Sequence, residues 1–99
     1  MINKILELYS RCGTSLLDDG IHDAVLPLSV ANEALELFSA AKWIVLGGDV
    51  YQQKSNKMQN FYADWHCNLS SPSESCNYAK EHLSLLIGEN IYVSFTIKN

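Results

Sequence analysis

Residues 91–98 alternate between apolar and polar side chains, and this pattern restricts the possible folds more than any other stretch of the sequence. The apolar positions are Ile91, Val93, Phe95 and Ile97. A period of two is typical of a β-strand that buries one face and leaves the other accessible. Such a strand needs neighbouring strands and a second layer over its apolar face, so the sequence predicts a sheet covered by helices.

Two further strands are expected upstream of this one. Lys42–Leu46 is apolar at every position but its first, which favours a strand covered on both faces or a central one. Met58–Cys67 is interpreted as the next strand, and the polar residues 52–57 as a loop between the two. Alternation places one set of side chains on its buried face, namely Phe61, Ala63, Trp65 and Cys67. The opposite face carries Tyr62, Asp64 and His66.

Two segments near the amino terminus have helical spacing. The first helix is predicted over residues 2–12 and stops before Gly13. The second is expected to begin at Ser29 as its N-cap. Its buried stripe is formed by Ala31, Ala34, Leu35 and Phe38. The residues between these helices have no clear period and are interpreted as an ordered loop. We expect this loop to be held by Leu16, Leu17, Ile21, Val25 and Leu28.

The third helix has the clearest start signal in the chain. Ser71 is its expected cap, Pro72 occupies the first helical position, and Glu74 completes a capping box. Gly88 is expected to end this helix.

Together these patterns predict an α+β domain over residues 1–99 with the order helix, helix, strand, strand, helix, strand. The expected sheet is three-stranded and mostly antiparallel, with about three helices packed on one face. The other face is then partly open, and an open face with aromatic residues is a candidate binding surface.

Composition narrows the possible partners. The 99 residues carry a formal net charge of −4, from 11 acidic and 7 basic side chains. The basic residues are dispersed, so no stripe neutralises a phosphate backbone, and we expect no direct binding of nucleic acid. Acidic excess favours basic partners instead. The sequence has no secretory signal and no apolar run that spans a bilayer. We therefore expect a soluble cytoplasmic protein without a membrane partner, as a monomer or weak homodimer.

The stretch WIVLGGDVY, residues 43–51, has glycines after an apolar strand, as phosphate-binding loops do. Such loops also need a helix directly after the glycines, or a lysine and a hydroxyl residue. Here Asp49 follows Gly47 and Gly48, and its negative charge would repel a phosphate. We interpret the two glycines as a bulge or bend in a strand, and we expect no cofactor.

His66 and Cys67 are the residues most suited to chemistry. With Cys76 and His82 they could be drawn as a zinc site, but the close ligand pairs of structural zinc sites are missing, so we expect no metal. Neighbouring residues of a regular strand point to opposite faces, which separates the imidazole of His66 from the thiol of Cys67. We expect no catalytic residues. The alternative is a small thiol- or metal-dependent hydrolase centred on Cys67 and His66.

Aromatic and acidic residues concentrate between Trp43 and His66. Trp43, Phe61 and Trp65 are expected to fill the core. The polar tips of the others are harder to bury without a partner, and tyrosine is a common anchor in protein interfaces. The predicted partner-binding residues are Asp49, Tyr51, Tyr62, Asp64 and His66.

Several pieces of the sequence resemble Immunity protein 40, a family of bacterial polymorphic-toxin systems, which include contact-dependent inhibition. They are GIHDAVLPLSVANEAL, WIVLGGDVY, FYADWHC, and the serine- and alanine-containing helix with its closing strand. The resemblance covers residues 20–97, and its most specific piece is residues 47–51. It implies a non-enzymatic inhibitor that binds a cognate toxin C-terminal domain and blocks its active site or substrate path. Many such toxins are nucleases with basic clefts. Acidic groups of the inhibitor could steer its association with such a cleft and occupy the phosphate-binding sites there. An adaptor subunit unrelated to toxins is the remaining alternative.

Overall fold

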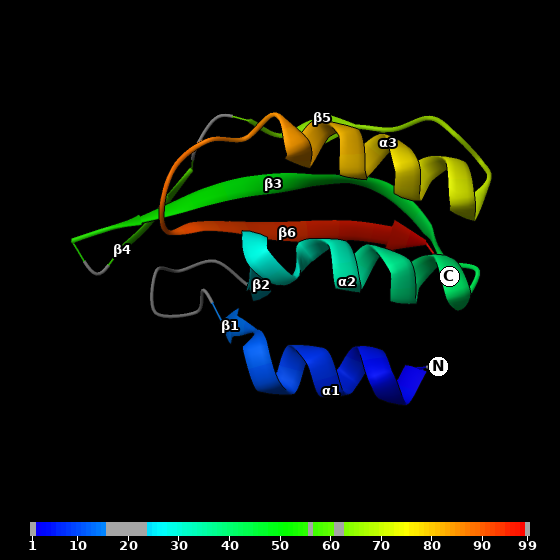
Figure 1. Ribbon diagram of the computed structural model, residues 1–99, viewed down its shortest axis with the longest axis horizontal. Coiled ribbons are helices and arrows are strands. Elements are labelled where there is room, and N and C mark those ends of the chain that lie inside the picture. The colour runs from blue at the N-terminus through cyan, green and yellow to red at the C-terminus, as the bar shows by residue number, and fades with distance from the viewer. Residues whose placement is uncertain (1, 16–23, 56, 61–62, 99) are drawn as a thin grey trace.

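The computed structural model describes residues 2–15, 24–55, 57–60 and 63–98. The elements are α1 Ile2–Cys12, β1 Thr14–Ser15, β2 Ala24–Pro27, α2 Leu28–Ala40, β3 Ile44–Lys54, β4 Lys57–Asn60, β5 Trp65–His66, α3 Pro72–Ser84 and β6 Ile91–Lys98 (Figure 1). The predicted α+β class, the first helix and the final strand are confirmed.

Within the described residues the sheet has six strands where three were predicted, and its pairings are antiparallel. The strand order is β1-β2-β6-β3-β4, and β5 also pairs with β3. The sequence prediction missed β1 and β2, which lie where an ordered loop was expected. These strands have two and four residues, too few to show a period of two. The expected loop contacts Leu16, Leu17 and Ile21 lie outside the described residues.

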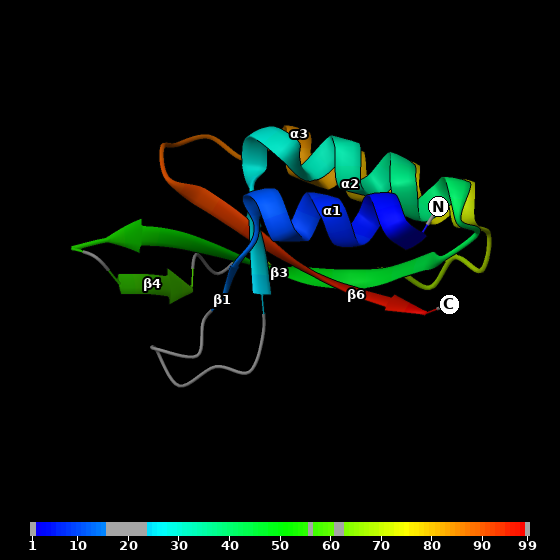
Figure 2. The same ribbon diagram turned by 90° about the horizontal axis from the view of Figure 1, so that it is seen from below.

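The three helices lie on one face of the sheet, as predicted (Figure 2). α2 and α3 contact each other and β3, and α1 lies beside α2. The predicted stripe of α2 is buried in the core, at Ala31, Ala34, Leu35 and Phe38. Phe38 stacks on Trp43 and meets the ring of Phe95 edge-on, at centroid distances of 5.9 and 5.5 Å. Aromatic contacts therefore join α2 to the start of β3 and to β6.

The two later helices begin differently. α3 starts as predicted, because the Oγ of Ser71 accepts a hydrogen bond from the backbone N–H of Glu74 at 3.4 Å and Pro72 opens the helix. The predicted cap of α2 is wrong. α2 begins at Leu28, directly after the extended Pro27, so Ser29 already lies within the first helical turn.

The prediction that Gly88 ends α3 is also wrong, since the helix stops at Ser84. The backbone N–H groups of Leu85 and Leu86 donate to the carbonyls three residues earlier, at 3.2 and 3.1 Å. These short-range bonds tighten the last turn and close the helix. Gly88, with a φ of 142°, belongs to the turn that leads into β6.

β3 extends beyond the predicted strand Lys42–Leu46 at its carboxyl end and starts two residues later. Residues 52–54 were expected in a loop, but they pair with β4 to form a hairpin. Gln52 and Gln53 are half-buried and Lys54 is exposed, so polar side chains are compatible with this end of the strand. The polar composition of residues 52–54 therefore led to the prediction of a loop in place of a strand.

A β-bulge interrupts the β3–β6 register between Val45 and Gly47, with Leu46 as the extra residue. The predicted bulge at the two glycines is confirmed within one residue. Gly47 has a φ of 154°, which side-chain-bearing residues rarely adopt, and a Cβ there would collide with the carbonyl oxygen of Trp65. The bulge changes which residues share a face: Val45 and Gly48 face the helices, whereas Gly47 and Asp49 face away.

The predicted strand Met58–Cys67 is wrong as a continuous element. It consists of β4 and β5, which pair with the same side of β3. Between the pairs Gly48–Trp65 and Tyr51–Asn60, β3 advances three residues while its partner advances five. The excess residues must leave the ladder, and this divides the strand. Residues 61 and 62 lie outside the described part of the chain.

Candidate functional site

A depression of about 450 Å³ lies on the uncovered face of the sheet, between β3 and β5. We name it the acidic hollow. Its lining is formed by Leu46, Gly47, Gly48, Asp49, Asp64, Trp65, His66, Cys67, Asn68 and Thr96. Two of these residues are carboxylates, and no lysine or arginine occurs among the described residues that line it. The acidic hollow therefore suits a positively charged group.

Strand pairing determines how the charged residues meet. His66 pairs with Gly47, so both lie on the uncovered face, and Asp49 lies two residues further along that face of β3. Asp64 immediately precedes β5 and is exposed. Without the extra residue in the bulge, Asp49 would lie on the same face as Val45, under the helices. The bulge thus brings Asp49 to the acidic hollow.

Trp65 supports the acidic hollow from the helix-covered side. Its indole packs beneath Gly48, where any Cβ would collide with the ring. The ring stacks on His82 of α3 at a centroid distance of 5.0 Å. The Nε2 of His82 donates a hydrogen bond to the carbonyl oxygen of Ala63 at 2.7 Å. Through His82, α3 therefore holds the residues on both sides of Asp64: the backbone of Ala63 and the side chain of Trp65.

Ser75 connects α3 to β3 next to the bulge. Its side chain is fully buried, and its Oγ accepts a hydrogen bond from the backbone N–H of Val45 at 3.0 Å. The same hydroxyl donates to the carbonyl oxygen of Pro72, also at 3.0 Å. A buried N–H without an acceptor is costly, so this contact stabilises the strand directly before Leu46.

The structure places four of the five predicted partner-binding residues, in two settings. Asp49, Asp64 and His66 meet in the acidic hollow. Tyr51 is 7% exposed and packs in a second small cluster with Val25, Met58 and Tyr92. Tyr62 lies outside the described residues.

The candidate dyad of His66 and Cys67 is divided between exposed and buried positions. Cys67 is 5% exposed, as expected for a core thiol, whereas His66 is exposed. Within the described part of the chain, no hydrogen bond joins their side chains. Among those same residues, no three His, Cys, Asp or Glu side chains gather as metal ligands. The structure therefore separates the buried Cys67 thiol from the exposed imidazole of His66.

Cys76 is a second buried thiol, on the inner side of α3. Its Sγ donates a hydrogen bond to the carbonyl oxygen of Leu35 at 3.3 Å, which links α3 to α2. Burial raises the pKa of the Cys76 thiol, because a thiolate would lose its hydration there. Cys76 therefore acts as a packing residue with a weak donor.

Sequence reasoning missed three residues of the acidic hollow, Leu46, Asn68 and Thr96. Leu46 belongs to an apolar run that was expected to be covered, but as the extra residue of the bulge it is 38% exposed. Thr96 pairs with Gly47 on the uncovered face. The glycines indicate a bulge but do not identify the extra residue. The sequence therefore could not predict on which side of the sheet the Leu46 side chain lies.

No helix in the described residues has the length and hydrophobicity needed to cross a bilayer. Comparison with protein families gives a match to the model described as Immunity protein 40, over residues 15–97. Comparison with curated proteins and with solved structures gives no significant match. The matched range includes the full lining of the acidic hollow.

Proposed function

Because this chain belongs to the Immunity protein 40 family, we propose that it binds a cognate bacterial toxin domain and neutralises it. The toxin is blocked sterically, at its active site or along its substrate path, and this chain performs no chemistry of its own. The family match over residues 15–97 is the observation that carries this proposal. The complex forms in the cytoplasm of the cell that makes the immunity protein.

The toxin-facing surface of this proposal is the acidic hollow with its neighbours. Asp64 and His66 are exposed there, and Asp49 is half-buried beside them. Tyr51 lies two residues beyond Asp49 on the same face of β3, where it is buried against Val25. Tyr62 completes the proposed set of five residues. The support is chemical, because two carboxylates, with no lysine or arginine among the described lining residues, complement a basic surface.

We further propose that the toxin is a nuclease. A nuclease cleft carries basic side chains that bind phosphates, and carboxylates can occupy the same positions. The net charge of −4 would also accelerate association with such a cleft by long-range attraction. Association should therefore slow as the salt concentration rises. Equal association rates at low and high salt would contradict this part of the proposal.

Co-expression tests the function directly. The toxin domain encoded in the neighbouring reading frame is expressed with and without this chain, and survival and co-purification are measured. Rescue of growth together with a stable complex is the expected result. A chain that neither rescues growth nor co-purifies with that toxin would instead favour an adaptor subunit unrelated to toxins.

A double charge reversal, Asp49→Lys with Asp64→Lys, tests the proposed surface. We expect the affinity for the toxin to fall at least tenfold without unfolding of the chain. The matched control is Glu81→Lys with Glu89→Lys, which changes the net charge equally at exposed positions outside the acidic hollow. Equal affinity of the two double variants would move the interface elsewhere, with residues 18–23 as the next acidic segment to test.

A further inference from the structure

A second depression of about 260 Å³ adjoins the acidic hollow. The two share Leu46, Cys67 and Asn68 in their linings, and we name the adjoining pair the β3 trough. Its added part is mostly apolar. Leu46 and Leu69, each 38% exposed, are among the large apolar side chains accessible there. An accessible apolar strip beside charged groups is the usual composition of a protein interface.

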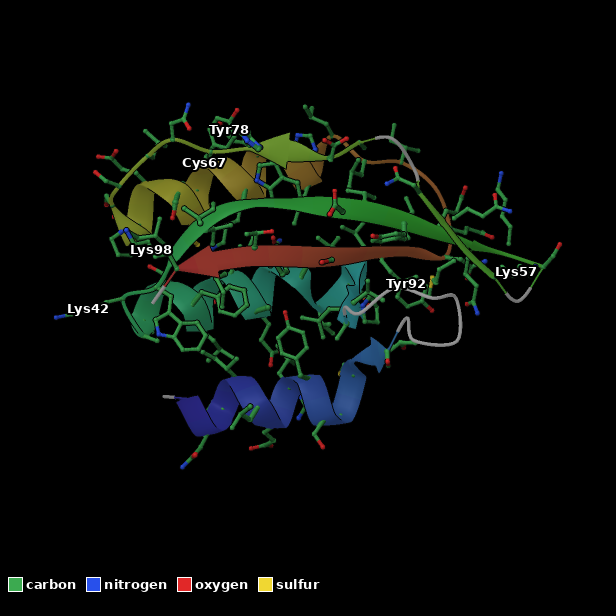
Figure 3. The ribbon with its side chains drawn as sticks, turned by 180° about the vertical axis from the view of Figure 1, so that it is seen from behind. Lys42, Lys57, Cys67, Tyr78, Tyr92 and Lys98 are labelled. Atoms are coloured by element: carbon green, nitrogen blue, oxygen red, sulfur yellow. The ribbon has the colours of Figure 1, made fainter. Side chains whose placement is uncertain are left out.

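The two ends of the β3 trough carry opposite charges. Asp49 and Asp64 line one end, and Lys98 lines the other. Strand register fixes this separation, because Lys98 pairs with Ile44 at the start of β3, whereas Asp49 lies five residues further along it. Figure 3 shows Cys67 and Lys98 toward the same end of the sheet and Lys57 at the opposite end. Because Leu46 is an extra residue, the same distance corresponds to four residues on β6, from Ser94 to Lys98, or roughly 13 Å at a rise of about 3.3 Å per residue.

Asp64 and Lys98 remain available to a partner. Both side chains are exposed. The ion pairs between described residues join Arg11 to Glu7 and Glu33, and Lys80 to Glu36, all on helices. Asp64 and Lys98, one at each end of the β3 trough, take part in none of these pairs.

We propose that the β3 trough binds one extended segment of the toxin, about five residues long, with a fixed direction. This inference rests on the proposed function and deepens it by naming the chemistry of the partner. The segment places a lysine or arginine between Asp49 and Asp64, an aliphatic side chain against Leu46 and Leu69, and a carboxylate beside Lys98. The length follows from the strand rise, and the direction follows from charge complementarity.

The reversed direction is disfavoured by the same charges. It would bring the cation of the segment to Lys98 and its carboxylate to the two aspartates. Like charges in contact weaken binding, and such repulsion fixes the register of a complex. The aliphatic centre contributes affinity through burial, whereas the charged ends contribute direction.

Three substitutions with matched controls test this inference in purified toxin complexes. Leu69→Lys is compared with Leu85→Lys, since Leu85 is 77% exposed but does not line the β3 trough. Asp64→Lys is compared with Glu81→Lys, and Lys98→Glu with Lys57→Glu. We expect the toxin Kd to rise at least tenfold for Leu69→Lys and three- to tenfold for each charge reversal. The controls should remain within twofold of the unchanged chain.

A photo-crosslinking residue provides a second measurement that does not depend on a loss of affinity. Placed at position 69 it should crosslink to the toxin, and placed at position 85 it should not. Circular dichroism confirms that each variant is folded before its affinity is interpreted.

The outcomes separate two kinds of failure. If the unchanged chain does not bind the toxin, the proposed function fails and this inference falls with it. If the unchanged chain binds, but all three trough variants stay within twofold of its Kd, then the toxin does not bind in the β3 trough. The proposed function is not contradicted by that result. Weakening by Leu69→Lys without any effect of Asp64→Lys and Lys98→Glu also overturns the proposal, because the segment would then lack the stated charges.

Discussion

The two faces of the β3–β6 pair are formed by the same strands but carry different side chains. On the helix-covered face, Val45, Val50 and Val93 have no exposed surface and belong to the main core. On the other face, the same strands present Gly47, Asp49 and Thr96 around a depression. One extra residue in β3 determines which side chains fall on each face.

The uncovered face is itself divided. Near the β3–β4 hairpin it is closed by a small cluster of Val25 and Tyr51 with Met58 and Tyr92. Near the bulge it stays open as the acidic hollow. Burial on the covered face supplies stability, whereas the open part of the other face can carry exposed charged side chains such as Asp64 at little cost to folding. Substitutions on the two faces should therefore differ in kind, changing stability on one and recognition on the other.

The largest effect is expected for Phe38→Ala on the covered face. Phe38 is 1% exposed and contacts the rings of Trp43 and Phe95, so its removal leaves a cavity at the centre of the core. The free energy of unfolding should fall by about 3–5 kcal/mol in urea denaturation. Phe38→Leu is the control and should lose clearly less. A loss below about 1 kcal/mol would show that this face does not dominate stability.

Gly48→Ala should produce the next largest loss. Although the change adds a single methyl group, its Cβ would collide with the Trp65 ring and lie 2.5 Å from the carbonyl oxygen of Ser94. Overpacking of this kind costs about 2–3 kcal/mol in the free energy of unfolding. Thr96→Ala, on the exposed side of the neighbouring strand, should change stability by less than about 0.5 kcal/mol. Similar losses for the two variants would contradict the difference between the faces.

Ser75→Ala tests the connection between the core and the bulge. The change leaves the buried N–H of Val45 without its acceptor, and a group left unsatisfied in this way costs about 1–3 kcal/mol. Urea denaturation measures this loss, and Ser10→Ala, at an exposed position of α1, is the control. If Ser75→Ala were as stable as Ser10→Ala, another acceptor would have to reach Val45, and the strand before the bulge would not depend on α3.

The sequence predicted elements whose pattern is local. The helix over residues 2–12, the capped start of α3 and the alternating β6 are each specified by spacings within one segment, and all three are confirmed. Elements defined by distant partners were missed. β2 pairs with residues more than sixty positions later in the chain, and β4 separates from β5 because of the residue count on β3. Nothing local in Met58–Cys67 indicates where that strand divides.

The candidate site shows the same limit. The sequence selected Asp49, Asp64 and His66 as polar groups in an aromatic segment, and the structure brings them to one depression. It could not assign Leu46 to that depression, since the residue occupies an apolar run. It also placed Tyr51 among accessible groups, whereas the side chain is 7% exposed. Both differences concern the face of the sheet on which a side chain lies, and this depends on strand register rather than on residue type.

The smallest stability effect is expected for Asp64→Lys on the uncovered face. Asp64 is exposed and takes part in none of the ion pairs found between described residues, so neither burial nor a charge partner is lost. The free energy of unfolding should change by less than about 0.5 kcal/mol, and this is measured by urea denaturation at low and at high salt. Glu81→Lys is the matched control. A loss above about 1 kcal/mol would make Asp64 a structural residue. Any weakening of toxin binding by its reversal could then follow from partial unfolding, and the two faces would no longer divide stability from recognition.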